Sequence, residues 1–362
     1  MASAPTQQAI LEALRGVMDP ERGKDIVSLQ MVKSVQVSGE GDVSIQVMLA
    51  SPASPLRGMI EGEVRASLSH LDGIRSVKLN LDAPPENRRL QDKAPIAGVK
   101  NLIAVASGKG GVGKTTIAVN LAIALKNLGA SVGLLDADVY GPNVPVMLGT
   151  NEQPRAIDER TIIPVEAYGV RMISMGLLNP GDKPLVWRGP MLHSVMQQFL
   201  RSVKWGDLDY LIIDLPPGTG DVQLSLIQSV SLTGAVVVTT PSIVALADVR
   251  KAIEMFRQVN VEILGIVENM SYFSCPHCEG RIDVFGHGEG LRLAQSFAVP
   301  FLGEIEIDPQ IRIGGDSGKP AASHGEDAPG AKSMYAVARN VAARLQELHQ
   351  SSAGAAPVVQ IL

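Results

Sequence analysis

One stretch constrains this chain more than any other: Gly108-Lys109-Gly110-Gly111-Val112-Gly113-Lys114-Thr115. It satisfies the pattern G-x-x-x-x-G-K-[S/T], with an apolar run at 102–106 before it and a helical pattern at 117–128 after it. Glycines in such a loop let backbone N–H groups turn inward around phosphate oxygens, where a side chain would collide. The following helix aims its positive end at the same anion. We therefore expect a phosphate-binding loop; a glycine-rich turn that binds nothing is the alternative.

Two lysines of this loop are expected to act differently. Lys114 should reach the β- and γ-phosphates of a nucleoside triphosphate, and the Thr115 hydroxyl should ligate magnesium. Lys109 lies so early in the loop that it points away from its own γ-phosphate and can reach a neighbouring nucleotide. In an enzyme that pairs two nucleotide sites face to face, Lys109 would work like an arginine finger supplied by the partner. The alternative is a solvated loop lysine.

Carboxylates follow two further apolar runs. Residues 132–135 lead into Asp136, with Asp138 two positions later, and residues 211–213 lead into Asp214. Carboxylates just past the C-terminal ends of parallel strands lie on the ligand-binding rim of a sheet. We expect Asp138 to position the attacking water, Asp136 to support magnesium and Asp214 to hold magnesium through water. For Asp136 and Asp138 the alternative is a solvated turn aspartate.

The fold class follows from the apolar runs beyond residue 101, which are too uniformly apolar to have a solvated face. They cover residues 102–106, 132–135, 211–213, 236–238 and 263–267. Helix-like segments such as 117–128 and 245–259 separate several of them. Buried parallel strands with crossover helices explain this pattern best. We predict a doubly wound, mainly parallel α/β domain over residues 99–350, with a last helix at 333–349 and a loose tail at 351–362.

The first 82 residues indicate a separate, smaller α+β unit. Apolar side chains recur at helical spacing over residues 10–17, and they alternate as in half-buried strands over 43–49 and 77–81. A hairpin signal precedes the first of these strands, and a second helix is expected between the two. The predicted order is helix, strand, strand, helix, strand. Residues 83–98, with prolines among charged residues, are typical of a linker.

Composition excludes several classes of protein. Of the 362 residues, 45% are hydrophobic and 19% are charged, which is an ordinary globular balance. The net charge of -5 argues against a general nucleic-acid binder, which normally carries a basic excess. No apolar run reaches the roughly 18 residues of a transmembrane helix. The amino terminus lacks the pattern of a secretory signal, so we expect a cytoplasmic protein that binds neither nucleic acid nor membrane.

The chain has only two cysteines, Cys275 and Cys278. In a reducing compartment such a pair more often serves metal or redox chemistry than structure. Disulfide oxidoreductases also use Cys-Pro-His-Cys, but there the pair opens a helix of a small thioredoxin fold, which nothing in this chain resembles. An inert pair of buried cysteines is a further alternative.

A structural metal site is usually closed by four thiolates or imidazoles. This chain offers two thiolates, with His277 poorly placed between them. Dimerisation across a two-fold axis is the simplest solution, because two thiolates from each chain make four. Four thiolates suit either zinc or a [4Fe–4S] cluster, and the spacing does not separate the two.

In combination, these motifs resemble the Mrp/ApbC family of iron–sulfur cluster carrier ATPases, within the larger group of MinD and the nitrogenase iron protein. The resemblance rests on the two-lysine loop, Asp138, the stretch Asp214-Leu-Pro-Pro-Gly-Thr-Gly-Asp and the cysteine pair, and it covers nearly the entire chain. The first domain resembles the MIP18-like unit, with Asp19-Pro20-Glu21 matching its early acidic turn.

The resemblance implies a function and a role for each matching residue. Family members are homodimers that hold a labile [4Fe–4S] cluster between subunits and pass it to apo-proteins with the help of ATP. Cluster scaffold proteins are implied as further partners, and ATP, Mg²⁺ and the bridging cluster as cofactors. The matching residues are Gly108 to Thr116 as the nucleotide loop, Lys109 as the lysine acting across the dimer, Asp138 and Asp214 as switch carboxylates, Asn269 against adenine, and Cys275 and Cys278 as cluster ligands.

One departure from the family concerns the first domain. Some MIP18-like domains carry a cysteine in the segment that matches residues 50–55, and this chain has none. The first domain is therefore expected to dock partners or to cover part of the nucleotide domain rather than to supply a cluster ligand.

Two other functions stay open from the sequence. A positioning ATPase like MinD explains the loop, but it leaves the cysteines idle. It also predicts a membrane-seeking helix, for which residues 333–349 have too little apolar surface. A zinc-bridged regulatory ATPase is the third reading.

Overall fold

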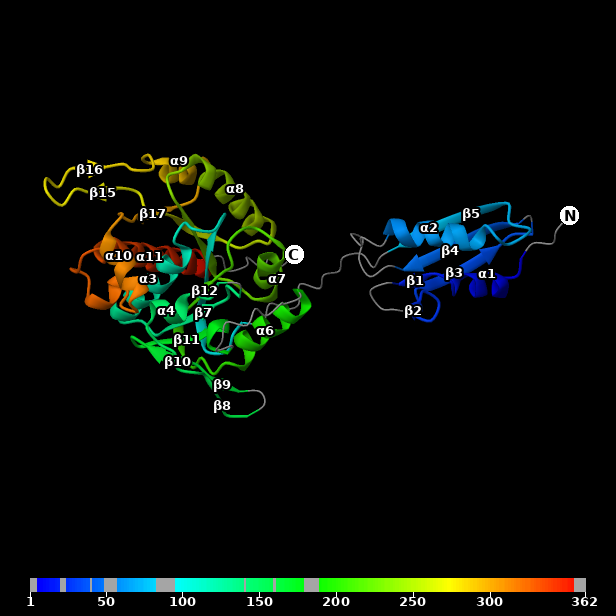
Figure 1. The fold of residues 1–362 in the computed structure, drawn as a ribbon, viewed down its shortest axis with the longest axis horizontal. Coiled ribbons are helices and arrows are strands. Elements are labelled where there is room, and N and C mark those ends of the chain that lie inside the picture. The colour runs from blue at the N-terminus through cyan, green and yellow to red at the C-terminus, as the bar shows by residue number, and fades with distance from the viewer. Residues whose placement is uncertain are drawn as a thin grey trace, which may run out of the picture. The chain divides into compact units, whose positions relative to one another are not determined.

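The computed structural model describes residues 5–19, 24–39, 41–48, 57–82, 95–139, 141–158, 161–178 and 189–354. Within it the chain divides into two compact units, Met1–Asp92 and Lys93–Leu362 (Figure 1). Several expected features lie outside the described residues: Pro20 and Glu21 of the acidic turn, Leu49, the segment 50–55, residues 83–94 of the linker and residues 355–362 of the tail.

Apart from one short strand pair, the first unit has the predicted order of helix, strand, strand, helix and strand. Its elements are α1 (Gln7–Leu14), β1 (Met18–Asp19), β2 (Lys24–Asp25), β3 (Val32–Val37), β4 (Asp42–Met48), α2 (Arg57–Leu68) and β5 (Ser76–Asp82). The sheet order is β3-β4-β5, with β4 antiparallel to β3 and parallel to β5. The predicted alternation is confirmed, because Val43, Ile45 and Val47 all point into the core. The short antiparallel pair β1–β2 was not predicted.

The described residues of the second unit form an eight-stranded sheet in the order β10-β11-β7-β12-β6-β13-β14-β17. Its strands are β6 (Val99–Ser107), β7 (Val132–Asp136), β10 (Val165–Ala167), β11 (Val170–Ser174), β12 (Leu208–Asp214), β13 (Gly234–Thr239), β14 (Ile263–Glu268) and β17 (Phe301–Glu304). All neighbours pair in parallel except β10 and β11. The predicted doubly wound, mainly parallel sheet is therefore confirmed, and each of the five apolar runs lies in a strand of it.

Helices and short strand pairs complete the second unit. They are α3 (Lys114–Asn127), α4 (Val144–Met147), β8 (Arg155–Ala156) with β9 (Ile162–Ile163), α5 (Met175–Leu178), α6 (Gly189–Ser202), α7 (Asp221–Ser229), α8 (Ile243–Gln258), β15 (Phe273–Ser274) with β16 (Arg281–Ile282), α9 (Glu289–Ser296), α10 (Pro309–Asp316), η1 (Ala321–His324) and α11 (Lys332–Gly354). Within the described ranges, no helix combines the length and apolar character that a membrane span needs.

Residues 102–106 of the central strand β6 are all apolar because both faces of the strand are covered. Ile103 and Val105 face a core shared with α3 and α11, which pack side by side (Figure 1). Leu102 and Ala104 face the opposite core, to which α6, α7, α8 and α9 contribute. Because helices cover both faces, no position within residues 102–106 needs to be polar. The polar side chains that end β6, β7 and β12 therefore meet at the carboxyl edge of the sheet.

Candidate functional site

The turn between β6 and α3 adopts a backbone that only glycine fits at two positions. At Gly113, φ is 81°, and an added Cβ would lie 2.2 Å from Nδ2 of Asn269. At Gly108, a Cβ would lie 2.3 Å from the backbone carbon of Asp248 in α8. No side chain caps α3 at Gly113. The first N–H groups of this helix therefore point toward the site without a capping acceptor, which is the arrangement that binds phosphate.

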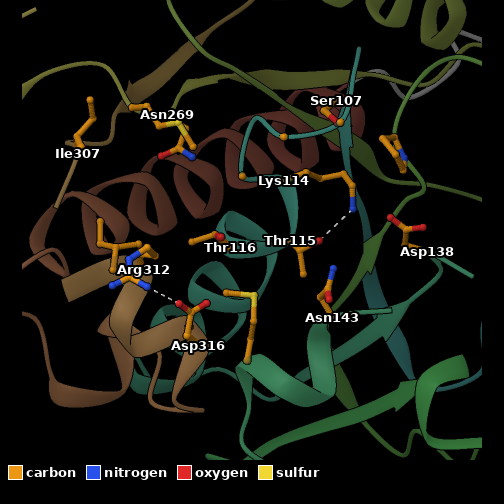
Figure 2. Close-up of a pocket in the computed structure, with 18 of the residues that line it drawn as sticks. Ser107, Lys114, Thr115, Thr116, Asp138, Asn143, Asn269, Ile307, Arg312 and Asp316 are labelled. Atoms are coloured by element: carbon orange, nitrogen blue, oxygen red, sulfur yellow. Dashed lines mark hydrogen bonds and ion pairs between the residues drawn. The ribbon is translucent and has the colours of Figure 1, made fainter. Parts of the chain in front are cut away.

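Lys114, Thr115 and Asp214 form one connected group at the floor of the site. The Lys114 ammonium lies 2.5 Å from Oδ1 of Asp214, and the Thr115 hydroxyl donates to Oδ2 of Asp214 at 2.7 Å. Lys114 Nζ also lies 3.3 Å from Thr115 Oγ1, the contact drawn as a dashed line in Figure 2. The side chain of Asp214 is fully buried, and this burial raises its pKa in spite of the lysine beside it. The strand-end aspartate predicted to hold magnesium thus adjoins the predicted threonine ligand.

Asp136 is buried behind the loop that carries Asp138. Its Oδ1 accepts a hydrogen bond from the backbone N–H of Asp138 at 3.1 Å. Its Oδ2 accepts from the Ser174 hydroxyl at 2.9 Å and from the Val144 N–H at 3.3 Å. Burial and the nearby charge of Asp214 raise the pKa of Asp136 to about 8. Asp136 therefore holds the loop between β7 and α4 in place, and a role toward magnesium stays a prediction. Ser174 belongs to no motif, so sequence reasoning missed it.

A cavity of about 550 Å³ is lined by Lys114 and Thr115 at its floor (Figure 2). The phosphate loop, Asp138 and Asn143 line one part of it, and residues 306–308 with Arg312 of α10 line another. The two parts come from segments far apart in the sequence. Residues 306–308 and Arg312 carry no motif, so sequence reasoning missed them.

Asn269 and Lys109 have contacts that bear on their predicted roles. Asn269 lines the cavity, and its Nδ2 donates to the carbonyl oxygen of Val112 in the phosphate loop at 2.9 Å. Its contact with adenine stays a prediction. Lys109 also lines the cavity and is partly exposed, and its carbonyl oxygen accepts a hydrogen bond from the Ser107 hydroxyl at 2.9 Å. Its role across a dimer stays a prediction as well.

Cys275 and Cys278 lie in the turn between β15 and β16. The turn is closed by hydrogen bonds from the N–H of Cys275 to the carbonyl of Gly280 at 3.0 Å and from the N–H of Glu279 to the carbonyl of Cys275 at 2.8 Å. Both thiols are free, and Cys278 is exposed. Hydrogen bonds from the backbone N–H groups of His277 and Cys278 lower the pKa of Cys275, which favours the thiolate that binds metals.

The cysteine pair stands apart from other ligands. Neither cysteine lines the cavity above the phosphate loop. Across the described part of the chain, no group of three or more His, Cys, Asp and Glu side chains is placed to hold a metal ion. Within one chain, the turn therefore offers two thiolates and no third ligand.

Two family profiles match the chain. Residues 98–342 match the family described as NUBPL iron-transfer P-loop NTPase, and residues 7–81 match the family described as iron–sulfur cluster assembly protein. A protein of Deinococcus radiodurans named iron–sulfur cluster carrier protein is 49% identical over 338 residues, which are 93% of this chain and 95% of the relative. The resemblance expected from the motifs is thereby confirmed over both units.

Solved structures extend the comparison to the fold. A nucleotide-binding protein of Archaeoglobus fulgidus, solved in complex with ADP, is 36% identical with a TM-score of 0.58, covering 68% of this chain and 95% of that one. The cell division ATPase MinD of Pyrococcus furiosus is 25% identical with a TM-score of 0.52, covering 67% of this chain and 98% of that one. The likeness to MinD is one of fold, whereas a relative that matches nearly the whole chain carries the cluster-carrier name.

Proposed function

Because this chain belongs to the NUBPL iron-transfer P-loop NTPase family, we propose that it is an ATP-dependent iron–sulfur cluster carrier. The cargo is a [4Fe–4S] cluster, which the protein delivers to apo-proteins. One observation carries this proposal: an exposed turn with two free thiols projects from the domain that bears the phosphate loop. An exposed position suits a cargo that must be received and released.

The nucleotide half of the proposal rests on the connected group at the floor of the cavity. Lys114 exchanges the Asp214 carboxylate for the β- and γ-phosphates when ATP enters, while the loop N–H groups surround the phosphate oxygens. The Thr115 hydroxyl and the Asp214 carboxylate, 2.7 Å apart, are hard oxygen donors of the kind Mg²⁺ takes. Bound there with the nucleotide, Mg²⁺ would neutralise charge on the phosphates. The proposed Mg²⁺ set is Thr115, Asp214 and, supporting them, Asp136.

Hydrolysis is assigned to residues at the rim of the cavity. Asp138 lines the cavity from a loop that Asp136 holds in place, so it can orient a water molecule toward the γ-phosphate. Lys109 is proposed to reach the nucleotide of a second copy and to stabilise the charge that develops there. The ATPase would then depend on the dimer.

The cargo half requires that second copy. A [4Fe–4S] cluster is held by four thiolates, and each chain supplies Cys275 and Cys278. A homodimer with the two turns at its two-fold axis supplies all four. The same dimer would bring each Lys109 toward the neighbouring nucleotide, so ATP and cluster would meet at one interface. Residues 1–82, as a separate domain, are left to dock recipients or scaffold proteins.

Anaerobic reconstitution of the full chain with ferrous iron and sulfide tests the proposal. Wild type should yield about four irons and four sulfides per dimer, with the broad absorption of a [4Fe–4S] cluster, and zinc should not account for the metal. Replacing both Cys275 and Cys278 with Ala should abolish cluster uptake, whereas Ser274→Ala beside them should retain it. Cluster uptake that survives the double replacement would overturn the proposal.

A further inference from the structure

Residues 271–290, the cysteine segment, carry the cysteine turn, and one buried side chain fixes both ends of this segment. Glu268, at the end of β14, accepts a hydrogen bond from the Ser271 hydroxyl at 2.7 Å where the segment begins. Its other oxygen accepts from the N–H of Gly290 at 2.6 Å, where α9 begins. The side chain of Glu268 is fully buried. The segment therefore leaves and rejoins the domain at one fixed point, and the turn between projects outward.

A short strip of chain, residues 304–308, touches both the cysteine segment and the nucleotide cavity. The N–H of Ile307 donates to the carbonyl oxygen of Tyr272, in the cysteine segment, at 2.6 Å. Ile307 also lines the cavity, together with Glu306 and Asp308 (Figure 2). A ligand that fixes this strip from the cavity side therefore acts on chain that is hydrogen-bonded to the cysteine segment.

Arg281 joins the far side of the cysteine turn to the same strip. Its Nη1 donates to Oε2 of Glu304 at 3.1 Å, and its Nε donates to Oδ1 of Asp283 at 2.8 Å. The guanidinium carbon lies 4.2 Å from the centre of the Tyr272 ring, and Nη2 lies 2.6 Å from Nδ1 of His287. Four groups thus converge on one side chain: Tyr272 just before β15, Asp283 and His287 after β16, and Glu304 at the end of β17.

These contacts have a geometric rather than an energetic value. The Arg281 side chain is 39% exposed, and ion pairs that water reaches contribute little to stability. A planar guanidinium can nevertheless bond two carboxylates and stack on a ring at once, which a lysine ammonium does not reproduce. The group therefore fixes the orientation of the turn relative to the strip without adding much to the stability of the fold.

We propose that Arg281 is a positioning residue that couples the nucleotide cavity to the cysteine turn. The inference rests on the proposed carrier function and adds to it the residue through which nucleotide acts on the cargo. Nucleotide in the cavity fixes residues 306–308, and Glu304 and Tyr272 pass that constraint through Arg281 to the turn. The coupling is reciprocal, so the cluster changes nucleotide affinity by the same factor by which nucleotide changes cluster affinity.

The test uses the full-length dimer loaded with cluster under anaerobic conditions. The rate at which bathophenanthroline removes iron is measured with and without the ATP analogue AMP-PNP and Mg²⁺. In wild type the two rates should differ by about fivefold or more, the lower end of usual coupling between sites. Arg281→Met keeps the aliphatic bulk and should bring the ratio to about one, and Arg281→Lys should give an intermediate ratio. Arg292→Met, at an exposed arginine of α9, is the matched control and should keep the wild-type ratio.

Glu304→Gln tests the same link from the β17 side and should also bring the ratio to about one. Should Arg281→Met take up no cluster, Glu304→Gln still tests the coupling. A wild-type ratio in either variant overturns the coupling through Arg281, and so does a wild-type protein whose iron release ignores AMP-PNP. A wild-type protein that takes up no cluster instead overturns the carrier function itself, so the two failures are distinguishable.

Discussion

The phosphate loop and the cysteine turn belong to the same unit, but they are built in opposite ways. Lys114 is 6% exposed and Asp214 is fully buried, and each finds its partner within the chain. Cys275 and Cys278 lie in an exposed hairpin turn with free thiols and no third ligand among the described residues. The first site is nearly complete in one chain, whereas the second supplies half of the ligands of the proposed cluster. Under the proposed carrier function, a dimer is therefore needed first of all for the cargo.

The difference follows from what each site must do. A phosphate site works by preorganised N–H groups and charges, and these keep their geometry because the core on both faces of β6 holds them. A cargo site must exchange its occupant with other proteins, so its ligands have to be reached from outside. If this comparison is right, changes at one site should leave the other intact unless they touch the link between them.

The largest effect is expected at the floor of the phosphate site. Lys114→Ala removes the ammonium that would bind the β- and γ-phosphates, and hydrogen bonds to charged groups contribute about 1.5–3 kcal/mol each. ATP affinity, measured by calorimetry, should fall about ten- to a hundredfold. Iron content after reconstitution should stay at the wild-type value, because Lys114 does not contact the turn.

Lys100→Ala is the matched control for this change, since it removes an exposed lysine that pairs with Asp209. It should leave ATP affinity and iron content unchanged. The comparison breaks if Lys114→Ala lowers iron content as strongly as it lowers ATP affinity, since the two sites would then not be separable.

Much of the fold was predictable because local pattern and final environment agree. The strands of the second unit are apolar on both faces, and the carboxylates Asp136 and Asp214 end two of them, side by side in the sheet register. The phosphate loop was predictable because its backbone demands glycine at fixed positions. In each case one short stretch of sequence carries both the signal and the structure.

The rest depends on contacts between distant segments. Ser174 holds Asp136 across 38 positions, and residues 306–308 reach the cavity from a late loop. Arg281 meets Glu304 from 23 positions away. A lone serine, a short loop and a single arginine have no pattern of their own, so only the folded chain reveals what they contact.

A smaller effect, on the free energy of unfolding, should distinguish two glycines of the phosphate loop from each other and from a glycine of the cysteine turn. Gly111 and Gly113 share a φ of 81°, but an added Cβ meets open space at Gly111 and Nδ2 of Asn269 at 2.2 Å at Gly113. Ala at either position has to adopt a left-handed backbone, which lowers the free energy of unfolding by about 1–2 kcal/mol. The free energy of unfolding of Gly113→Ala, measured in urea, should be about 1–2 kcal/mol lower than that of Gly111→Ala, because Asn269 has to move.

Gly280→Ala is the corresponding variant at the cysteine turn. No left-handed φ is required there, and the added Cβ would lie 3.3 Å from the Sγ of Cys278. The free energy of unfolding should change by no more than about 0.5 kcal/mol. Equal losses at all three glycines would contradict the contrast between a tightly packed loop and an open turn.

The smallest effect is expected for His277, which lies between the two cysteines and is exposed. If the four ligands are two thiolates from each chain, the imidazole has no place in the set, and His277→Ala should keep the iron content and absorption of wild type. If iron instead falls by half or more while Ser274→Ala keeps it, His277 is a ligand. A chain would then offer three ligands, one short of the four that a [4Fe–4S] cluster takes. The cysteine turn would no longer supply half of the ligand set, and the contrast between the two sites would shrink.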